Sequence, residues 1–277
     1  MSKALIIGGA GKMGQRFASL FAEFGFDVSI SDLDDALSQD LVKGFDIVLI
    51  AVSMEAASSI AKKVAPWIRK DSLIADINSL KTDICQIYLD NCHGESVGLH
   101  PMCGPTVANF QGQKLIWCPV KTGSLSDQLK TILKSSGFEI LESSPEHHDK
   151  MMSVVQVLMH LTTMVMGEAL RKLDIDIAET LKFTSPIYKI ELSVIGRLFA
   201  QDPSLYAEIL TENPFSKQVV EKFQAASLEI GESIVNNNRS HIVASFGGTQ
   251  KFLGSFCEEA MNFSDSLIDF VAQGKEE

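Results

Sequence analysis

The chain has 277 residues, of which 45% are hydrophobic and 21% charged, and its formal net charge at pH 7 is −11. This length suits two domains and a substantial core. The acidic balance argues against nucleic acid and against an anionic membrane surface as partners. The five cysteines, at positions 85, 92, 103, 118 and 257, include no C-x-x-C pair. We therefore predict reduced thiols, no metal site and a cytoplasmic location.

The first half of the chain alternates short apolar runs with helical patterns. We predict strands over residues 4–7, 28–30, 47–52, 73–77, 97–99, 115–118 and 138–141, and helices over 13–24, 55–67, 83–89 and 125–135. Apolar strands that alternate with helices are typical of a mainly parallel sheet covered on both faces. The pattern predicts an α/β, Rossmann-type domain over residues 1–144.

The second half shows no convincing strand. We predict helices over residues 145–173, 177–199, 203–210, 216–236 and 240–273. The stretch 151–166 is apolar nearly all round, which indicates burial in a core or against a partner chain, and it is too short and too polar for a membrane span. Beside it, His147, His148 and Asp149 read as a solvated helix start. We expect residues 145–277 to form an all-helical domain that binds substrate and makes a homodimer.

A glycine fingerprint stands at the start of the chain. A predicted strand runs into Gly9-x-Gly11-x-x-Gly14 and then into a helix, the pattern that cradles a pyrophosphate on a helix N-terminus. Asp32 ends the second strand, where it can accept hydrogen bonds from a ribose 2′-hydroxyl. Asp34 and Asp35 follow with no Arg nearby, so a 2′-phosphate would be repelled. This favours NAD over NADP, although a glycine turn without a ligand is the alternative. The candidate cofactor-binding residues are Gly9, Gly11, Lys12, Met13, Gly14, Asp32 and Ser79.

Two polar segments follow further predicted strands: INSLK at 77–81 and GLHPMCGP at 98–105. Ligands of open α/β sheets bind beyond the carboxyl ends of the strands, so Ser79 and His100 are expected to face the nicotinamide. A histidine titrates near neutrality and can take a hydroxyl proton while hydride leaves the same carbon. A purely structural role for His100 is the alternative.

The motifs resemble those of the prephenate dehydrogenase family, and in particular the dehydrogenase half of bifunctional chorismate mutase–prephenate dehydrogenases. The matching stretches are GGAGKMG, INSLK, GLHPMCGP, EHHDKMM, the helix with Gln156 and His160, and SPIYKIELSVIGRLFAQDPSLY. No mutase segment precedes the fingerprint, so we expect a monofunctional enzyme. The resemblance implies NAD-dependent oxidative decarboxylation of prephenate, a small dicarboxylate, to 4-hydroxyphenylpyruvate in tyrosine biosynthesis.

The resemblance also implies roles for individual residues. His100 would be the base, and Ser79 would bind the substrate hydroxyl and order the nicotinamide. Arg197 would hold a substrate carboxylate, because a guanidinium suits that bidentate task. His160 would lie near the pyruvyl side chain, with a satisfied core histidine as the alternative. Lys189 stands where close relatives carry Arg, and it keeps the charge without the fork geometry.

Three other functions compete with this interpretation. Arogenate dehydrogenase acts on a substrate with an amino group where prephenate has a keto group. Amino-deoxyprephenate dehydrogenase acts on one with an amine in place of the ring hydroxyl, whereas a histidine base at position 100 fits a hydroxyl best. Lys189 and Met159 depart from the family pattern, and these positions concern the side-chain end of the substrate. A non-catalytic NAD-binding sensor would keep the fold without turnover, but the presence of Ser79, His100 and Arg197 argues against it.

Overall fold

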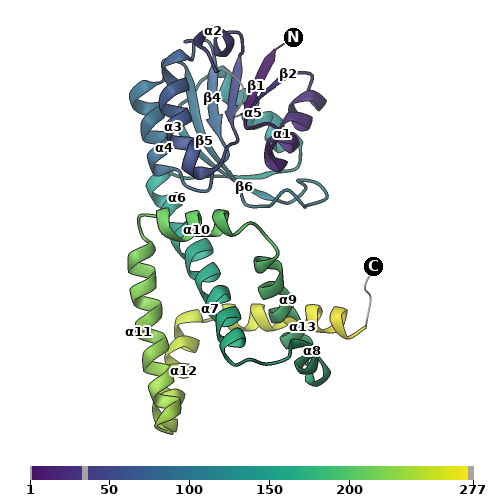
Figure 1. Ribbon diagram of the computed structural model, residues 1–277, viewed down its shortest axis with the longest axis vertical. Helices are drawn as coiled ribbons and strands as arrows, with labels where there is room; N and C mark the ends of the chain where they lie inside the picture. Colours follow the sequence, from purple (N-terminus) through teal and green to yellow (C-terminus); the bar gives the residue numbers. More distant parts are fainter. Residues whose placement is uncertain (1, 33–36, 274–277) are drawn as a thin grey trace. The chain divides into compact units, whose positions relative to one another are not determined.

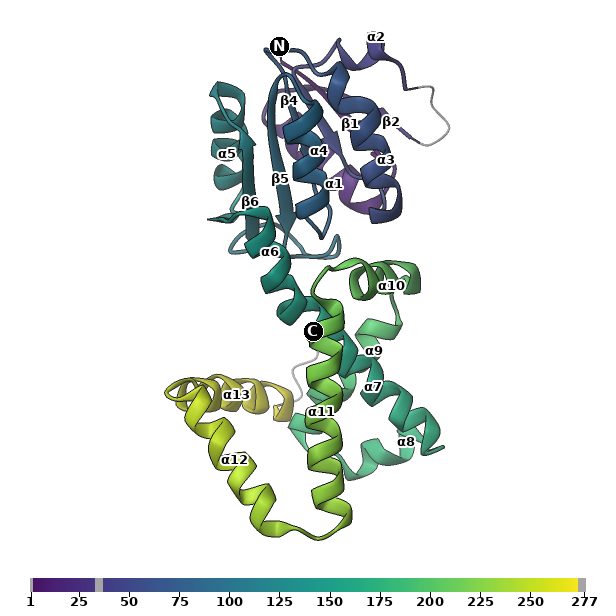
Figure 2. The ribbon, with the colours of Figure 1, turned by 90° about the vertical axis from the view of Figure 1, so that its left-hand side faces the viewer.

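The computed structural model describes residues 2–32 and 37–273, so Asp34 and Asp35 lie outside the described residues. Two compact units make up the fold (Figures 1 and 2). The first unit comprises Met1–Val155 and Ser204–Phe215, and the second comprises Gln156–Pro203 and Ser216–Glu277. The chain thus leaves the first unit, returns to it for a short stretch, and leaves it again.

The first unit is built on a sheet of seven strands in the order β2-β1-β3-β4-β5-β6-β7. The strands are β1 Lys3–Ile7, β2 Asp27–Ser31, β3 Ile47–Ile50, β4 Leu73–Asp76, β5 Glu95–Pro101, β6 Lys114–Lys121 and β7 Glu139–Glu142. All neighbours pair in parallel except β5 and β6, which are antiparallel. The predicted strands and the Rossmann-type class are confirmed.

Helices cover both faces of this sheet. Strand β1 shows why, because its side chains alternate between the two faces. Ala4 and Ile6 join a core cluster with α1 (Lys12–Glu23) and α5 (Ser124–Ser135). Leu5 and Ile7 join a second cluster on the opposite face. There the covering helices are α2 Gln39–Val42, α3 Met54–Val64, which a 3-10 turn Ala65–Trp67 extends, and α4 Thr82–Asn91.

The rest of the described chain is helical, which confirms the expected class of the second half. One continuous helix combines α6 (Pro145–Met152), a π-helical turn (Ser153–Leu158) and α7 (Met159–Lys172). The other helices are α8 Ile177–Thr180 with a 3-10 turn Leu181–Phe183, α9 Pro186–Phe199, α10 Pro203–Glu212, α11 Ser216–Val235, α12 Arg239–Leu253 and α13 Phe256–Ala272.

Two predicted helices prove to be broken. The segment 177–199 is interrupted before Pro186, which starts α9 with Ser185 as its N-cap. A proline disfavours helix in the residue before it, so a new helix starts there. The segment 240–273 is interrupted at Gly254, which has φ 57°. Glycine adopts this left-handed conformation without strain and therefore separates α12 from α13.

The helices of the second unit bury few of their own side chains. Helices α7, α12 and α13 contain no buried residue, and large apolar side chains such as Phe252 (87% exposed) and Phe246 (73% exposed) face outward. Within the stretch 151–166, Met152, Ser153 and Val157 are buried, whereas large apolar side chains such as Val154 and Met159 are exposed. This chain alone therefore does not bury the stretch on every side, and cover by a partner chain remains the prediction. The helix Pro145–Lys172 is long and apolar enough to cross a membrane, a property that it shares with core helices of soluble proteins.

Candidate active site

The glycine loop joins β1 to α1 at the carboxyl edge of the sheet. Gly8 makes the turn in the left-handed conformation (φ 83°), and the N–H of Gly11 donates to the carbonyl of Gly8 at 3.2 Å. A Cβ on Gly14 would lie 2.4 Å from that same carbonyl oxygen. The turn therefore falls one residue before the expected Gly9, while Gly14 provides the close approach of helix and strand.

The acid after β2 lies against this loop. The carboxylate of Asp32 accepts a hydrogen bond from the backbone N–H of Ala10 at 2.8 Å. Lys12 and Met13 begin α1, whose first N–H groups have no partner within a helix. A phosphate-binding helix start with a carboxylate beside it is the arrangement that a dinucleotide with a free ribose 2′-hydroxyl fits.

The other two expected groups follow neighbouring strands. Strands β4 and β5 are parallel, with Asp76 opposite Gly98. Ser79 lies just past the end of β4 and is half-buried, whereas His100 lies near the end of β5 and is buried. The structure thus places Ser79 and His100 at the carboxyl edge of adjacent strands, the edge at which the glycine loop also lies.

His100 belongs to a buried chain of hydrogen bonds. Its Nδ1 lies 2.9 Å from Nε2 of His148, and Nδ1 of His148 lies 2.7 Å from Oδ1 of Asp149. His148 and Asp149 are each only 1% exposed. The expectation of a solvated helix start is therefore wrong for these two residues and holds only for His147, which is exposed.

The carboxylate of Asp149 has further partners. The backbone N–H groups of Lys81 and Thr82 donate to its two oxygens, each at 2.8 Å, at the N-terminus of α4. The amide of Asn213, from the segment that returns to the first unit, donates to the backbone carbonyl of Asp149 at 2.8 Å. Although burial raises the pKa of Asp149, hydrogen bonds from His148 and Thr82 hold it below its ordinary value. Asp149 is therefore ionised at neutral pH.

Lys81 is a structural cation rather than a ligand-binding one. Its side chain is fully buried, and its ammonium pairs with Asp76 and donates to the carbonyl of Leu99 at 2.9 Å. A Cβ on Gly98 would lie 2.9 Å from Cδ of Lys81, so the glycine makes room for this side chain. The ion pair fixes the end of β4 next to β5, one residue before His100.

The surroundings of His100 favour a neutral ring. The pKa of His100 lies well below its ordinary value, mainly because the ring is buried. The nearby His148 and Lys81 lower this pKa further. A buried imidazole that is neutral at pH 7 has a lone pair with which it can accept a proton. This is the protonation state that a general base requires before the reaction.

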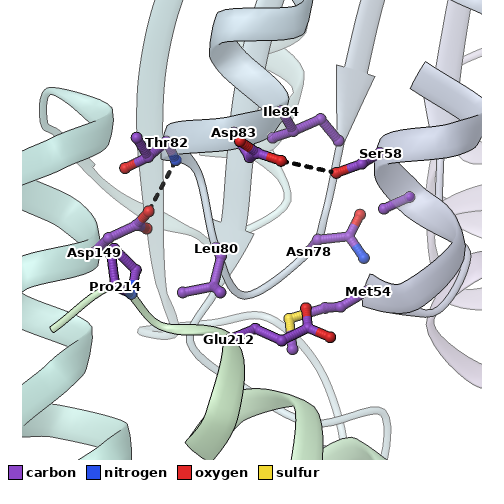
Figure 3. Close-up of a pocket in the computed structure, with 11 residues that line it drawn as sticks. Met54, Ser58, Asn78, Leu80, Thr82, Asp83, Ile84, Asp149, Glu212 and Pro214 are labelled. Atoms are coloured by element: carbon purple, nitrogen blue, oxygen red, sulfur yellow. Dashed lines mark hydrogen bonds between the residues drawn. The ribbon is translucent and has the colours of Figure 1, made fainter. Parts of the chain in front are cut away.

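Asn78 and Leu80, the two neighbours of Ser79 in the chain, line a cavity of about 460 Å³ (Figure 3). Met54, at the start of α3, and Thr82, at the start of α4, also line it. Its ionisable lining groups are Asp83, Asp149 and Glu212. Three carboxylates without a lining cation disfavour an anionic ligand, and neither His100 nor Ser79 lines this cavity.

The three expected substrate-binding residues all lie in the second unit. His160 is near the start of α7, and Lys189 and Arg197 are on α9. These helices are antiparallel, because Gly167 packs against Phe199 whereas Leu173 shares a cavity with Tyr188.

The antiparallel packing separates the three residues into two groups. His160 and Arg197 lie toward the same end of the helix pair. Lys189 is eight residues before Arg197 on the same helix, which places it roughly 12 Å away along the helix axis. Arg197 is exposed within this chain, and His160 and Lys189 are half-buried.

Sequence reasoning missed His148 and Asp149. The signal that could have found them is helical spacing, because His148 and Met152 are four residues apart and share the buried face of α6. The pair of adjacent histidines concealed it, since only one of the two, His148, is buried.

Comparison with known proteins agrees with this architecture. A family model described as the nucleotide-binding domain of prephenate dehydrogenase matches residues 25–141. A second model, the dimerization domain of prephenate dehydrogenase, matches residues 144–248. Together the two models cover most of the chain and both of its halves.

Individual relatives agree with the family models. The chain is 30% identical to the T-protein of Haemophilus influenzae over 96% of its own length and 71% of that protein. It is 31% identical to a probable arogenate/prephenate dehydrogenase of Methanocaldococcus jannaschii, over 95% of the chain and 64% of the relative.

A solved structure shares the fold. It is the crystal structure of prephenate dehydrogenase from A. aeolicus in complex with hydroxyphenyl propionate and NAD⁺. The TM-score is 0.69, with 23% identity over 90% of this chain and 96% of that one. From the fold, the glycine loop and these matches, the chain belongs to the prephenate dehydrogenase family.

Proposed function

We propose that this protein is an NAD-dependent prephenate dehydrogenase, which converts prephenate to 4-hydroxyphenylpyruvate and CO₂ in tyrosine biosynthesis. The observation that carries the proposal is His100: a buried imidazole, held neutral at the carboxyl edge of β5, in a fold that binds a nucleotide at that same edge. A neutral histidine matches a substrate that loses a hydroxyl proton.

The proposed cofactor is NAD⁺, which accepts the hydride when bound. The glycine loop and the first turn of α1 would hold its pyrophosphate. Asp32, held by Ala10, would accept hydrogen bonds from the adenosine ribose and repel the 2′-phosphate of NADP. The NAD⁺ in the A. aeolicus structure is consistent with this choice.

The proposed reaction divides the work among few residues. The hydroxyl proton of the substrate passes to His100 as hydride leaves the same ring carbon. The ring carboxylate departs as CO₂, its bonding electrons complete the aromatic ring, and the resulting phenolate oxygen takes the proton back from His100. Ser79 binds the hydroxyl and orders the nicotinamide, which restricts the reacting atoms to a productive geometry.

Substrate binding is assigned to the second unit. Arg197 would hold a carboxylate in a bidentate ion pair, and His160 would lie near the side chain of the substrate. Lys189 would contribute positive charge from further along α9. The family model for this half is named for dimerization, and the exposed apolar faces of α7, α12 and α13 fit a homodimer in which a second copy covers them. The proposal includes a cytoplasmic location, without membrane or nucleic-acid partners.

The substrate is tested by direct comparison. Purified protein with NAD⁺ is assayed on prephenate, arogenate and amino-deoxyprephenate, and we expect the highest kcat/KM on prephenate. Arogenate is the second candidate, because the M. jannaschii relative is named for both substrates. A strong preference for arogenate would refute our choice of substrate.

The base is tested by substitution. His100→Asn is expected to abolish turnover and to leave the Kd for NAD⁺ unchanged, measured by calorimetry. Binding of NAD⁺ without turnover by the wild-type protein would instead support a sensor. Undiminished turnover in the variant would show that His100 is not the base.

A further inference from the structure

When both imidazole rings are neutral, the hydrogen-bond chain from Asp149 to His100 fixes their proton positions. Ionised Asp149 is an acceptor, so Nδ1 of His148 must carry the hydrogen that it donates at 2.7 Å. A neutral His148 then has a lone pair on Nε2, which must accept at 2.9 Å from Nδ1–H of His100. With its hydrogen on Nδ1, a neutral His100 has its lone pair on Nε2.

Asp149 itself cannot turn away from this arrangement. Two backbone N–H groups at the start of α4 fix its carboxylate, and the amide of Asn213 fixes its backbone. The helix N-terminus also favours the negative charge. Backbone groups at the N-terminus of α4 and the amide of Asn213 thus fix the orientation of the hydrogen-bond chain from Asp149 to His100.

We infer that His148 is a positioning residue for the base His100. It selects the Nδ1–H tautomer of His100, directs Nε2 toward the reacting hydroxyl, and shares the proton that His100 takes up. The inference rests on the proposed function, because it assumes that His100 is the base of the dehydrogenase reaction.

The proton transfer balances without a further reactant. The substrate O–H bond breaks and its proton joins Nε2 of His100, which becomes an imidazolium. The Nδ1 proton of His100 can then move to Nε2 of His148. The positive charge thereby comes to lie beside the carboxylate of Asp149, where a buried charge is compensated. Hydride transfer and loss of CO₂ proceed as described above.

The other charged groups that face the two rings do not replace this role. Lys81 and Asp76 lie on the α4 and β4 side, but they are paired with each other. Asp149 is the carboxylate that hydrogen-bonds directly to His148. The two imidazole rings are nearly perpendicular, at 71°, so the contact between them is a directed hydrogen bond rather than stacking.

Three variants separate positioning from folding. His148→Ala removes the acceptor for His100. His148→Gln retains an amide oxygen that can accept from Nδ1–H of His100 but cannot carry a proton at neutral pH. His147→Ala is the matched control, because it removes the adjacent, exposed histidine of the same helix.

Steady-state kinetics give the first readout. We expect His148→Ala to lower kcat about 10- to 100-fold, less than the full contribution of a general base, with KM and the Kd for NAD⁺ changed less than about 3-fold. His148→Gln should recover part of kcat and alter the acid limb of the pH profile. The inference is overturned if His148→Ala behaves like His147→Ala, or if Gln fails to recover kcat in a protein with wild-type thermal stability.

The second readout does not depend on turnover. Side-chain ¹⁵N–¹H spectra of the six histidines, assigned by single substitutions, report the tautomer of each ring. We expect His100 with its hydrogen on Nδ1 in the wild type and a mixture of tautomers in His148→Ala. An Nε2–H tautomer of His100 in the wild type would refute the inference even in an active enzyme. Correct tautomers in a protein that turns over none of the three substrates would refute the proposed function alone.

Discussion

Asp32 accepts a hydrogen bond from the backbone N–H of Ala10, so the acid after β2 is tied directly to the glycine loop after β1. The two parallel strands end at the same edge, with Ile7 opposite Ser31. Because the loop holds the carboxylate of Asp32, the distance between this carboxylate and a phosphate bound on the loop is fixed. The relationship suits a nucleotide whose ribose hydroxyls are free.

The charge of Asp32 is expected to determine the choice between NAD⁺ and NADP⁺. Asp32→Asn retains an oxygen that can accept from Ala10 but removes the charge. We expect the preference for NAD⁺ to fall about 10-fold or more, as the loss of a charge-assisted hydrogen bond implies. Competition binding of the two nucleotides measures it. The control is Asp27→Asn, an exposed acid at the opposite end of the same strand; an equal effect of both variants would contradict the role.

Gly14 is expected to tolerate no side chain. A Cβ there would collide with the backbone oxygen of Gly8, which cannot rotate away. Gly14→Ala should therefore weaken NAD⁺ binding at least about 10-fold and lower the melting temperature. Gly231→Ala is the control, because nothing lies within 4 Å of a Cβ at that helical position. Unchanged affinity in Gly14→Ala would show that the loop does not hold the cofactor.

The depressed pKa of His100 predicts a pH dependence of stability. In the unfolded chain His100 takes up a proton below about pH 6.5, whereas in the folded protein it stays neutral to a lower pH. The unfolded state then binds more protons, so the free energy of unfolding falls as the pH decreases below about 6.5. The slope contributed by one such group is about 1.4 kcal/mol per pH unit.

Denaturant unfolding between pH 5 and 8 measures this slope. His100→Asn should reduce it by about one proton, while His147→Asn, which changes an exposed ring, should leave it unchanged. The neutral base also predicts that kcat/KM stays level when the pH is lowered from 7.5 to 6.5. A slope that is the same in all three proteins would mean that His100 titrates normally.

The contributions of Arg197 and Lys189 to substrate binding can be compared directly, because both residues lie on α9 but toward different ends of it. Arg197→Ala is expected to raise KM about 10- to 100-fold with a smaller change in kcat, as for the loss of hydrogen bonds to a charged group. Arg197→Lys should recover part of the affinity. Lys189→Ala should raise KM less, because it lies toward the other end of α9. The reverse order would make Lys189 the carboxylate anchor.

Sequence patterns predicted the sheet well because its strands are short apolar runs bounded by turns. The residues 4–7 and 47–50 are apolar without interruption, as buried parallel strands require. The breaks at Pro186 and Gly254 were visible in the sequence, but long apolar periodicity on both sides outweighed them. Helical spacing marks His148 as a residue of the buried face of α6, but its role could not be predicted, since its partner His100 on β5 lies far away in the chain.

The short return of residues 204–215 to the first unit limits how this protein can be dissected. Asn213 supplies a buried hydrogen bond to the backbone of Asp149, so a fragment that stops at Val155 loses that bond along with α10. Recombination between members of the family at a single crossover would pair the carboxylate from one parent with the amide segment from another. Chimeras that exchange the stretch around Asp149 together with residues 204–215 should retain the hydrogen bond between Asn213 and Asp149. They should therefore also retain the buried contact between His100 and His148.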